Sequence, residues 1–127
     1  MPQVYAIIGK EAQRECTELE IDAFLERVGL CVSKRFDIVE EQDIATTVIH
    51  AARTKGEAQI QIEIRYTAGT DEYGKGIFDP SVEVQEALID DIRRQFERHF
   101  KSLHRRVGRP SVWCKPYRGG AFHVDKF

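Results

Sequence analysis

The second residue of the sequence is a proline, and an amino-terminal proline can act as a catalytic base. If Met1 is removed, Pro2 becomes a chain end whose secondary amine has a reference pKa of about 8. Nearby cations and partial burial would lower that pKa further and leave the amine uncharged at neutral pH. Such a base can take a proton from a carbon next to a carbonyl group and return it at another carbon. Small residues are also common after an initiator methionine, so the proline alone is not diagnostic.

The same reaction would need a cation close to the base. An enolate forms as the proton leaves, and a dicarboxylate or α-keto acid substrate is itself anionic, so arginine or lysine is the natural partner. The candidates are Arg35, Arg65, Lys115 and Arg118. Each of them can also be an ordinary solvated surface charge, which is the common state of these residue types.

No pattern for a metal or a cofactor is present in the sequence. The four histidines lack the paired spacing of a metal site, and they are His50, His99, His104 and His123. His99 and His104 fall on or near the basic surface of the second expected helix. Neither a phosphate-binding glycine loop nor a nucleophile elbow occurs. The cysteines are too few for a disulfide framework and fit reduced thiols; they are Cys16, Cys31 and Cys114. We therefore expect neither a metal nor a cofactor.

Composition predicts a single domain over residues 1–127. The chain is 42% hydrophobic and 31% charged, as in ordinary globular proteins. No apolar run approaches the roughly 20 residues that span a bilayer, and no basic region precedes the apolar start, so we expect a cytoplasmic protein without a membrane partner. The net charge of −2 is divided into −10 over residues 1–92 and +8 over residues 93–127. The basic part is expected to meet an anion: a small carboxylate substrate, a nucleic acid or an acidic neighbouring subunit.

Hydrophobic periodicity predicts an α+β fold of two consecutive β-α-β units. Strands are expected over residues 3–8, 44–52, 59–66 and 111–115. One helix is expected over residues 17–35, where Thr17 and Glu20 form a capping box. A loop over residues 67–79 then leads to a second helix, which is expected to begin at Asp79-Pro80 and to end near Val107.

The third expected strand alternates between an apolar and a polar face. Its apolar residues are Ile60, Ile62, Ile64 and Tyr66, and its polar residues are Gln59, Gln61, Glu63 and Arg65. This period of two indicates a sheet with one packed face and one wet face. We therefore predict a four-stranded sheet with both helices on one face.

These features resemble the tautomerase superfamily across nearly the whole chain, especially the branches of 5-carboxymethyl-2-hydroxymuconate isomerase and macrophage migration inhibitory factor. The likeness lies in Met1-Pro2 entering a strand, in the alternation from Ala58 to Gly69, and in the closing strand with its glycine-rich tail. The resemblance implies a cofactor-independent tautomerase or isomerase acting on a small anionic keto or enol acid, with Pro2 as the base.

The resemblance also bears on the candidate cations. Trp113 and Lys115 fall where the inhibitory-factor branch has a tyrosine and an asparagine lining the proline pocket, which favours these two residues. The sequence departs from the family at Val39, where that branch has a lysine, and at Thr70, where the muconate isomerase has an arginine. Either a shifted set of cations or a loss of activity would follow.

Two other functions are compatible with the sequence. A ferredoxin-like domain has the same element order and could bind nucleic acid through the basic segment of residues 93–118. The residues that would bind are Arg93, Arg94, Arg98, Lys101, Arg105, Arg106 and Arg109. The polar sheet face lacks the stacking aromatics that single-stranded nucleic acid would need there, so this function is less favoured. The other alternative is a non-catalytic oligomer of tautomerase fold.

The polar sheet face also predicts a homotrimer. One face of the sheet is left uncovered, and its edge strands invite pairing with another chain. The resembling family joins three sheets edge to edge around a central channel, and a wall of Gln, Glu and Arg side chains suits a water-filled channel.

Overall fold

The computed structural model describes residues 2–37, 44–51, 58–70, 76–78 and 80–118, with the backbone alone at residues 67–70, 76–78, 117 and 118. Along the chain the elements are β1 (Gln3–Ile8), α1 (Lys10–Glu15), α2 (Glu18–Arg35), β2 (Ala45–His50), β3 (Ile60–Thr70), β4 (Gly76–Phe78), α3 (Val82–Ser102) and β5 (Ser111–Arg118). The two predicted units are confirmed as β1-α2-β2 and β3-α3-β5. The short helix α1 and the short strand β4 were not predicted.

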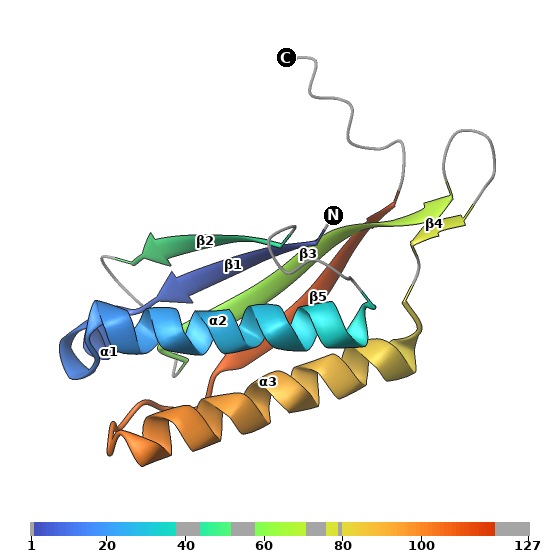
Figure 1. The fold of residues 1–127 in the computed structure, drawn as a ribbon. Helices are drawn as coiled ribbons and strands as arrows, with labels where there is room; N and C mark the ends of the chain where they lie inside the picture. Colours follow the sequence, from blue (N-terminus) through green and yellow to red (C-terminus); the bar gives the residue numbers. More distant parts are fainter. Residues whose placement is uncertain (1, 38–43, 52–57, 71–75, 79, 119–127) are drawn as a thin grey trace, which may run out of the picture.

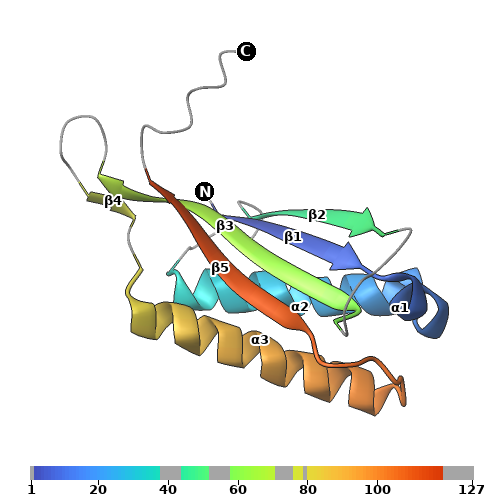
Figure 2. The same ribbon diagram turned by 180° about the vertical axis from the view of Figure 1, so that it is seen from behind.

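The four long strands form a mixed sheet in the order β2-β1-β3-β5 (Figure 1). Strand β1 runs parallel to β2 and antiparallel to β3, while β5 runs parallel to β3. Each β-α-β unit thus supplies one parallel pair joined by a crossover helix. Helices α2 and α3 lie side by side on one face of the sheet, and no helix of the described residues lies on the other face (Figure 2).

The core lies between the sheet and the two long helices. On β3 the predicted apolar face is confirmed, because Ile60, Ile62 and Ile64 are fully buried against the helices. Helix α2 begins with the predicted capping box: the Thr17 hydroxyl accepts a hydrogen bond from the Glu20 amide at 3.2 Å, and the Glu20 carboxylate accepts one from the Thr17 amide at 2.8 Å. Phe24 then enters the core one turn later. Among the described residues, no helix is both long and apolar enough to cross a bilayer.

The prediction of a loop over residues 67–79 is wrong at both ends. Strand β3 continues to Thr70, and residues 76–78 form β4. Gly69 pairs with Phe78 and Thr70 with Gly76 in an antiparallel ladder, which satisfies backbone groups that a loop would expose to water. Strand β5 likewise runs three residues beyond the predicted end, because its parallel pairing with β3 persists as far as Arg118.

Both ends of α3 differ from the prediction. The helix begins at Val82, and its cap is Ser81, whose hydroxyl accepts a hydrogen bond from the Val84 amide at 3.2 Å. The predicted cap at Asp79 lies outside the described residues. The helix ends at Ser102 rather than near Val107, since His104 takes a φ of 57° and turns the chain.

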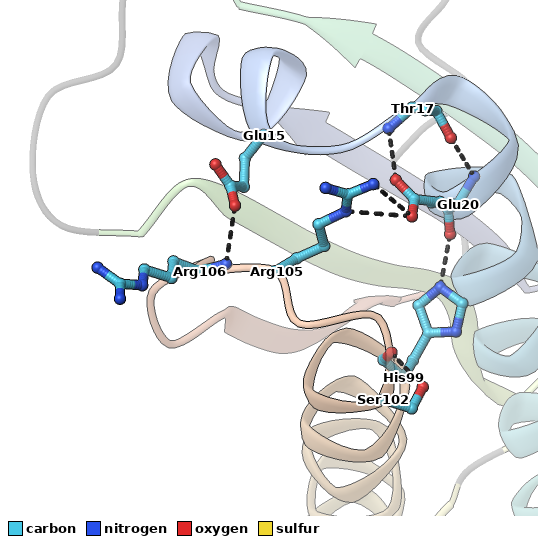
Figure 3. Close-up of polar contacts among 7 residues, drawn as sticks. All are labelled: Glu15, Thr17, Glu20, His99, Ser102, Arg105 and Arg106. Carbon is cyan, nitrogen blue, oxygen red and sulfur yellow. Dashed lines mark hydrogen bonds and ion pairs between the residues drawn. The ribbon is translucent and has the colours of Figure 1, made fainter.

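The end of α3 is fastened to the start of α2 by polar contacts (Figure 3). His99, expected on the basic surface, is instead buried, and its Nε2 lies 2.6 Å from the Glu20 carbonyl oxygen. The Arg105 guanidinium pairs with the Glu20 carboxylate at 3.2 Å, and the Arg106 amide donates to the Glu15 carboxylate at 3.2 Å. Part of the predicted basic surface is therefore used within the fold.

Candidate active site

Three of the predicted site residues lie together on the open face of the sheet. Strand pairing sets Glu63 opposite Trp113 and Arg65 opposite Lys115. Paired residues of neighbouring strands project to the same face, and this face is the one opposite the buried isoleucines. Arg65, Trp113 and Lys115 thus belong to one patch, with Glu63 at its centre.

Glu63 forms ion pairs with both cations of this patch. One carboxylate oxygen lies 2.9 Å from the Lys115 ammonium, and the other accepts from Arg65 Nη2 at 2.7 Å and from Nε at 3.0 Å. Only 7% of Glu63 is exposed. The hydrogen bond from Lys115 and that from Arg65 lower the pKa of Glu63 against the opposing effect of burial. The group is therefore a carboxylate at neutral pH, and we call Glu63, Arg65 and Lys115 the charged triad.

Aromatic rings flank the charged triad. The Arg65 guanidinium carbon lies 4.0 Å from the centre of the Tyr5 ring, and the Lys115 nitrogen lies 5.6 Å from the centre of the Trp113 ring. Cations at these distances are attracted to the face of an aromatic ring. Trp113 is 44% exposed, so it offers an apolar wall beside a cation. This combination suits a ligand with a carboxylate attached to an apolar body.

Pro2 lies at the same end of the sheet as the charged triad. It is buried and directly precedes Gln3, which pairs with Arg65, and Arg65 in turn pairs with Lys115. Adjacent strands are about 4.8 Å apart, so the start of β1 is about 10 Å from β5 across β3. Alternation directs the Pro2 ring to the helix side of the sheet, whereas the triad lies on the open side. The ring nitrogen is a backbone atom and stays in the plane of the strand.

Of the other two predicted cations, Arg35 lies away from this patch. Arg35 lies at the end of α2, where its Nη2 donates to the Asp91 carboxylate of α3 at 3.1 Å. That ion pair joins the two helices and lowers the pKa of Asp91. The backbone of Arg118 continues β5 three residues past Lys115, but its side chain lies outside the described part.

The sequence interpretation placed Glu63 on the polar face but assigned it no role in the site. The sequence does not show directly that β3 pairs with β5. That pairing places Glu63 next to Lys115, which is far away in the sequence. The rule that a β-α-β crossover usually joins neighbouring parallel strands would have predicted this contact.

The described residues also include side chains that in other settings bind metals or act as nucleophiles. No group of three or more His, Cys, Asp or Glu side chains among them could hold a metal ion. All three cysteines are free thiols, and burial raises the pKa of Cys16 and of Cys114 to about 11. Because the thiolate is the reactive form, neither of these two thiols is poised as a nucleophile at neutral pH.

Comparison with known proteins identifies the fold. No family model and no curated protein matches the sequence. A fused 4-OT, described as a wild-type symmetric trimer, superposes with a TM-score of 0.63 at 12% identity and covers 91% of this chain and 85% of its own. A macrophage migration inhibitory factor-like protein from Entamoeba histolytica gives 0.56 at 13% identity, with 90% and 87% covered. Malonate semialdehyde decarboxylase gives 0.60 at 11% identity, with 91% and 84% covered.

These structures all have the fold of the tautomerase superfamily, so the resemblance inferred from the sequence is confirmed at the level of the fold. Identities of 11–13% establish the fold alone.

Proposed function

We propose that this protein is a cofactor-independent tautomerase that moves a proton on a small keto or enol acid. Pro2, freed by removal of Met1, is the general base; Lys115 and Arg65 bind the anion, and Trp113 forms a wall of the pocket. The observation that carries the proposal is the placement of two cations and an exposed indole at the sheet end where β1 begins. The tautomerase-superfamily fold supports it.

The proposed reaction divides the work between the base and the cations. The Pro2 nitrogen accepts the proton of the enol hydroxyl or of a carbon next to the carbonyl, and negative charge then develops on the oxygen. Lys115 or Arg65 stabilises that charge or holds the substrate carboxylate. The prolinium ion returns the same proton at the other position, so the amine is regenerated and no net proton is taken up.

We propose that a second subunit completes the pocket beside Pro2 and the charged triad. We propose a homotrimer in which the open face and the edge of one sheet meet those of the next. Two features support it. The edge strand β2 is exposed along its whole length, including Val48 and Ile49, and three fused 4-OT structures with this fold are described as trimers.

The trimer gives a direct expectation for the mass in solution. Light scattering on the untagged protein should give about three times the 14.6 kDa chain mass, as expected for three subunits closed into a ring of cyclic symmetry. A monomer whose mass does not change with concentration would contradict the trimer and remove the shared pocket.

Substitution of Lys115 tests the anion-binding part of the proposal. A hydrogen bond to a charged group is worth about 1.5–3 kcal/mol, so Lys115→Ala should lower kcat/KM for phenylenolpyruvate by about tenfold or more. The matched control is Lys101→Ala, which removes the same charge from an exposed position of α3 and should leave kcat/KM unchanged. Equal effects of the two substitutions would refute the role of Lys115.

Nucleic-acid binding remains the competing function because α3 exposes Arg93, Arg98 and Lys101. The structure weakens the case at other positions, since Arg94 pairs with Asp91 and Arg105 with Glu20. A binding constant for DNA or RNA that falls steeply with salt would favour this function. A trimer with neither turnover nor such binding would instead indicate the non-catalytic oligomer.

A further inference from the structure

A groove lies between the second half of α3 and the segment that joins this helix to β5. Its volume is about 660 Å³, and small-molecule sites typically have roughly 300–1,000 Å³. Pro110 lines the groove and directly precedes Ser111, which pairs with Gln61, whereas Lys115 pairs with Arg65. Four residues along a strand correspond to about 13 Å. The groove is therefore distinct from the charged triad, and the proposed reaction does not use it.

The floor of the groove is apolar. Phe96 and Phe100 lie one turn apart on the same side of α3, and Val107 and Pro110 come from the segment that follows the helix. The two phenylalanines are almost completely buried, so they expose only a small part of their rings. Val107 and Pro110 are partly buried and add further apolar surface. A ligand that fills this groove needs an apolar body.

Cationic side chains surround the apolar floor. Arg93 and Lys101 come from α3 and Arg109 from the segment before β5, and all three are exposed. Within the described part of the chain, neither arginine takes part in an ion pair. Glu97 is the one acidic residue among the described residues that line the groove. Three cations and one carboxylate leave an excess of two positive charges.

A fourth cation, Arg105, is held in a fixed position at the wall of the groove (Figure 3). Its Nε and Nη2 both lie 3.2 Å from the same Glu20 carboxylate oxygen, and its backbone amide donates to the Phe100 carbonyl at 2.9 Å. Glu20 balances its charge, but a guanidinium group has five N–H donors, and the side chain is 37% exposed. Donors therefore remain for a ligand, and a preformed wall lowers the cost of ordering on binding.

We propose that this groove binds a small phosphate monoester with an apolar body, such as an aryl phosphate. A phosphate monoester carries a charge of about −1.5 to −2 at pH 7, which matches the two excess positive charges. Guanidinium groups bind phosphate oxygens through pairs of parallel hydrogen bonds, and Arg93 and Arg109 reach the groove from different segments. A carboxylate, or a phosphate diester of a nucleic acid, carries one charge and would leave one cation uncompensated.

Isothermal titration calorimetry of the full-length protein with 1-naphthyl phosphate tests both parts of the proposed ligand. Inorganic phosphate lacks the apolar body, and 1-naphthoate carries one negative charge. The dissociation constant of 1-naphthyl phosphate should be lower than that of either compound by about tenfold or more. Inorganic phosphate that binds as tightly would refute the contact with the apolar floor. 1-Naphthoate that binds as tightly would refute the preference for phosphate.

Substitutions of arginine locate the binding. Arg93→Gln and Arg109→Gln should each raise the dissociation constant of 1-naphthyl phosphate by about fivefold or more. Circular dichroism checks that both variants fold. The matched control is Arg98→Gln, because Arg98 is exposed on α3 but does not line the groove; its dissociation constant should equal that of the wild-type protein. Unchanged affinity in both Arg93→Gln and Arg109→Gln would overturn the proposal.

Two further results would also overturn it. Loss of 1-naphthyl phosphate binding in Lys115→Ala would place the ligand at the charged triad instead of the groove. Salt-sensitive binding of a single-stranded oligonucleotide that Arg93→Gln and Arg98→Gln weaken equally, together with no measurable binding of 1-naphthyl phosphate, would assign this surface of α3 to nucleic acid.

Discussion

Replacement of Pro2 with alanine is expected to reduce enol–keto turnover by at least about tenfold, because positioned general bases typically contribute about 10²–10⁴-fold. The alanine variant still allows removal of Met1 and leaves a primary amine with a similar reference pKa of about 8. The variant therefore replaces a rigid secondary amine with a primary amine rather than deleting the base, which is why we expect a loss of at least about tenfold rather than the full 10²–10⁴-fold. The measurement is kcat/KM for phenylenolpyruvate under identical conditions.

The fold is expected to survive this substitution. Pro2 precedes β1 and has no backbone N–H to lose from the sheet. A matched control is Pro110→Ala, since Pro110 precedes β5 at the end of the sheet where Ser111 pairs with Gln61, away from the start of β1. The control should leave turnover unchanged.

The mature amino terminus has to be established alongside the kinetics. Mass spectrometry of the intact protein distinguishes a chain that retains Met1 from one that begins at Pro2. A protein that keeps Met1 has an amide at the proline nitrogen, which is not basic. Full activity in that form, or unchanged turnover in Pro2→Ala, would refute the role of Pro2.

The fold was predictable from the sequence because its periodic signals are strong and local. The alternation along β3 and the helical spacing of apolar residues after Thr17 each depend on neighbours within a few positions. Helix and strand ends were less predictable. The sequence prediction took Asp79-Pro80 as the helix start, whereas the observed cap is Ser81. The continuation of β3 to Thr70 depends on its pairing with residues 76–78.

The site was predictable only in part, because its contacts join distant segments. Trp113 and Lys115 were chosen from the resemblance, and the structure places both on the open face. The ion pairs of Glu63 required knowledge of which strands are neighbours. The burial of His99 likewise depends on the Glu20 carbonyl, 79 positions away, and the helical spacing of His99 gave no sign of that partner.

The largest change in stability is expected from a substitution in the core, on the helix side of the sheet. Phe24 is fully buried, and its ring centre lies 5.4 Å from that of Phe96 and 5.4 Å from that of Phe100. These contacts join α2 to α3, the two helices that cover the sheet. Truncation of a buried phenylalanine to alanine typically costs about 3–5 kcal/mol in transfer free energy and cavity formation.

Phe24→Ala is therefore expected to lower the free energy of unfolding by about 3–5 kcal/mol, a large part of the roughly 5–15 kcal/mol that stabilises a typical domain. Leu19→Ala is the matched control, because Leu19 belongs to the same helix but is 80% exposed; its effect should stay within about 0.5 kcal/mol. Urea denaturation followed by circular dichroism measures both variants. Protein concentration has to be equal throughout, since association would make the apparent stability depend on it. If Phe24→Ala lowers the free energy of unfolding no more than Leu19→Ala does, the contacts of Phe24 between α2 and α3 do not stabilise the core.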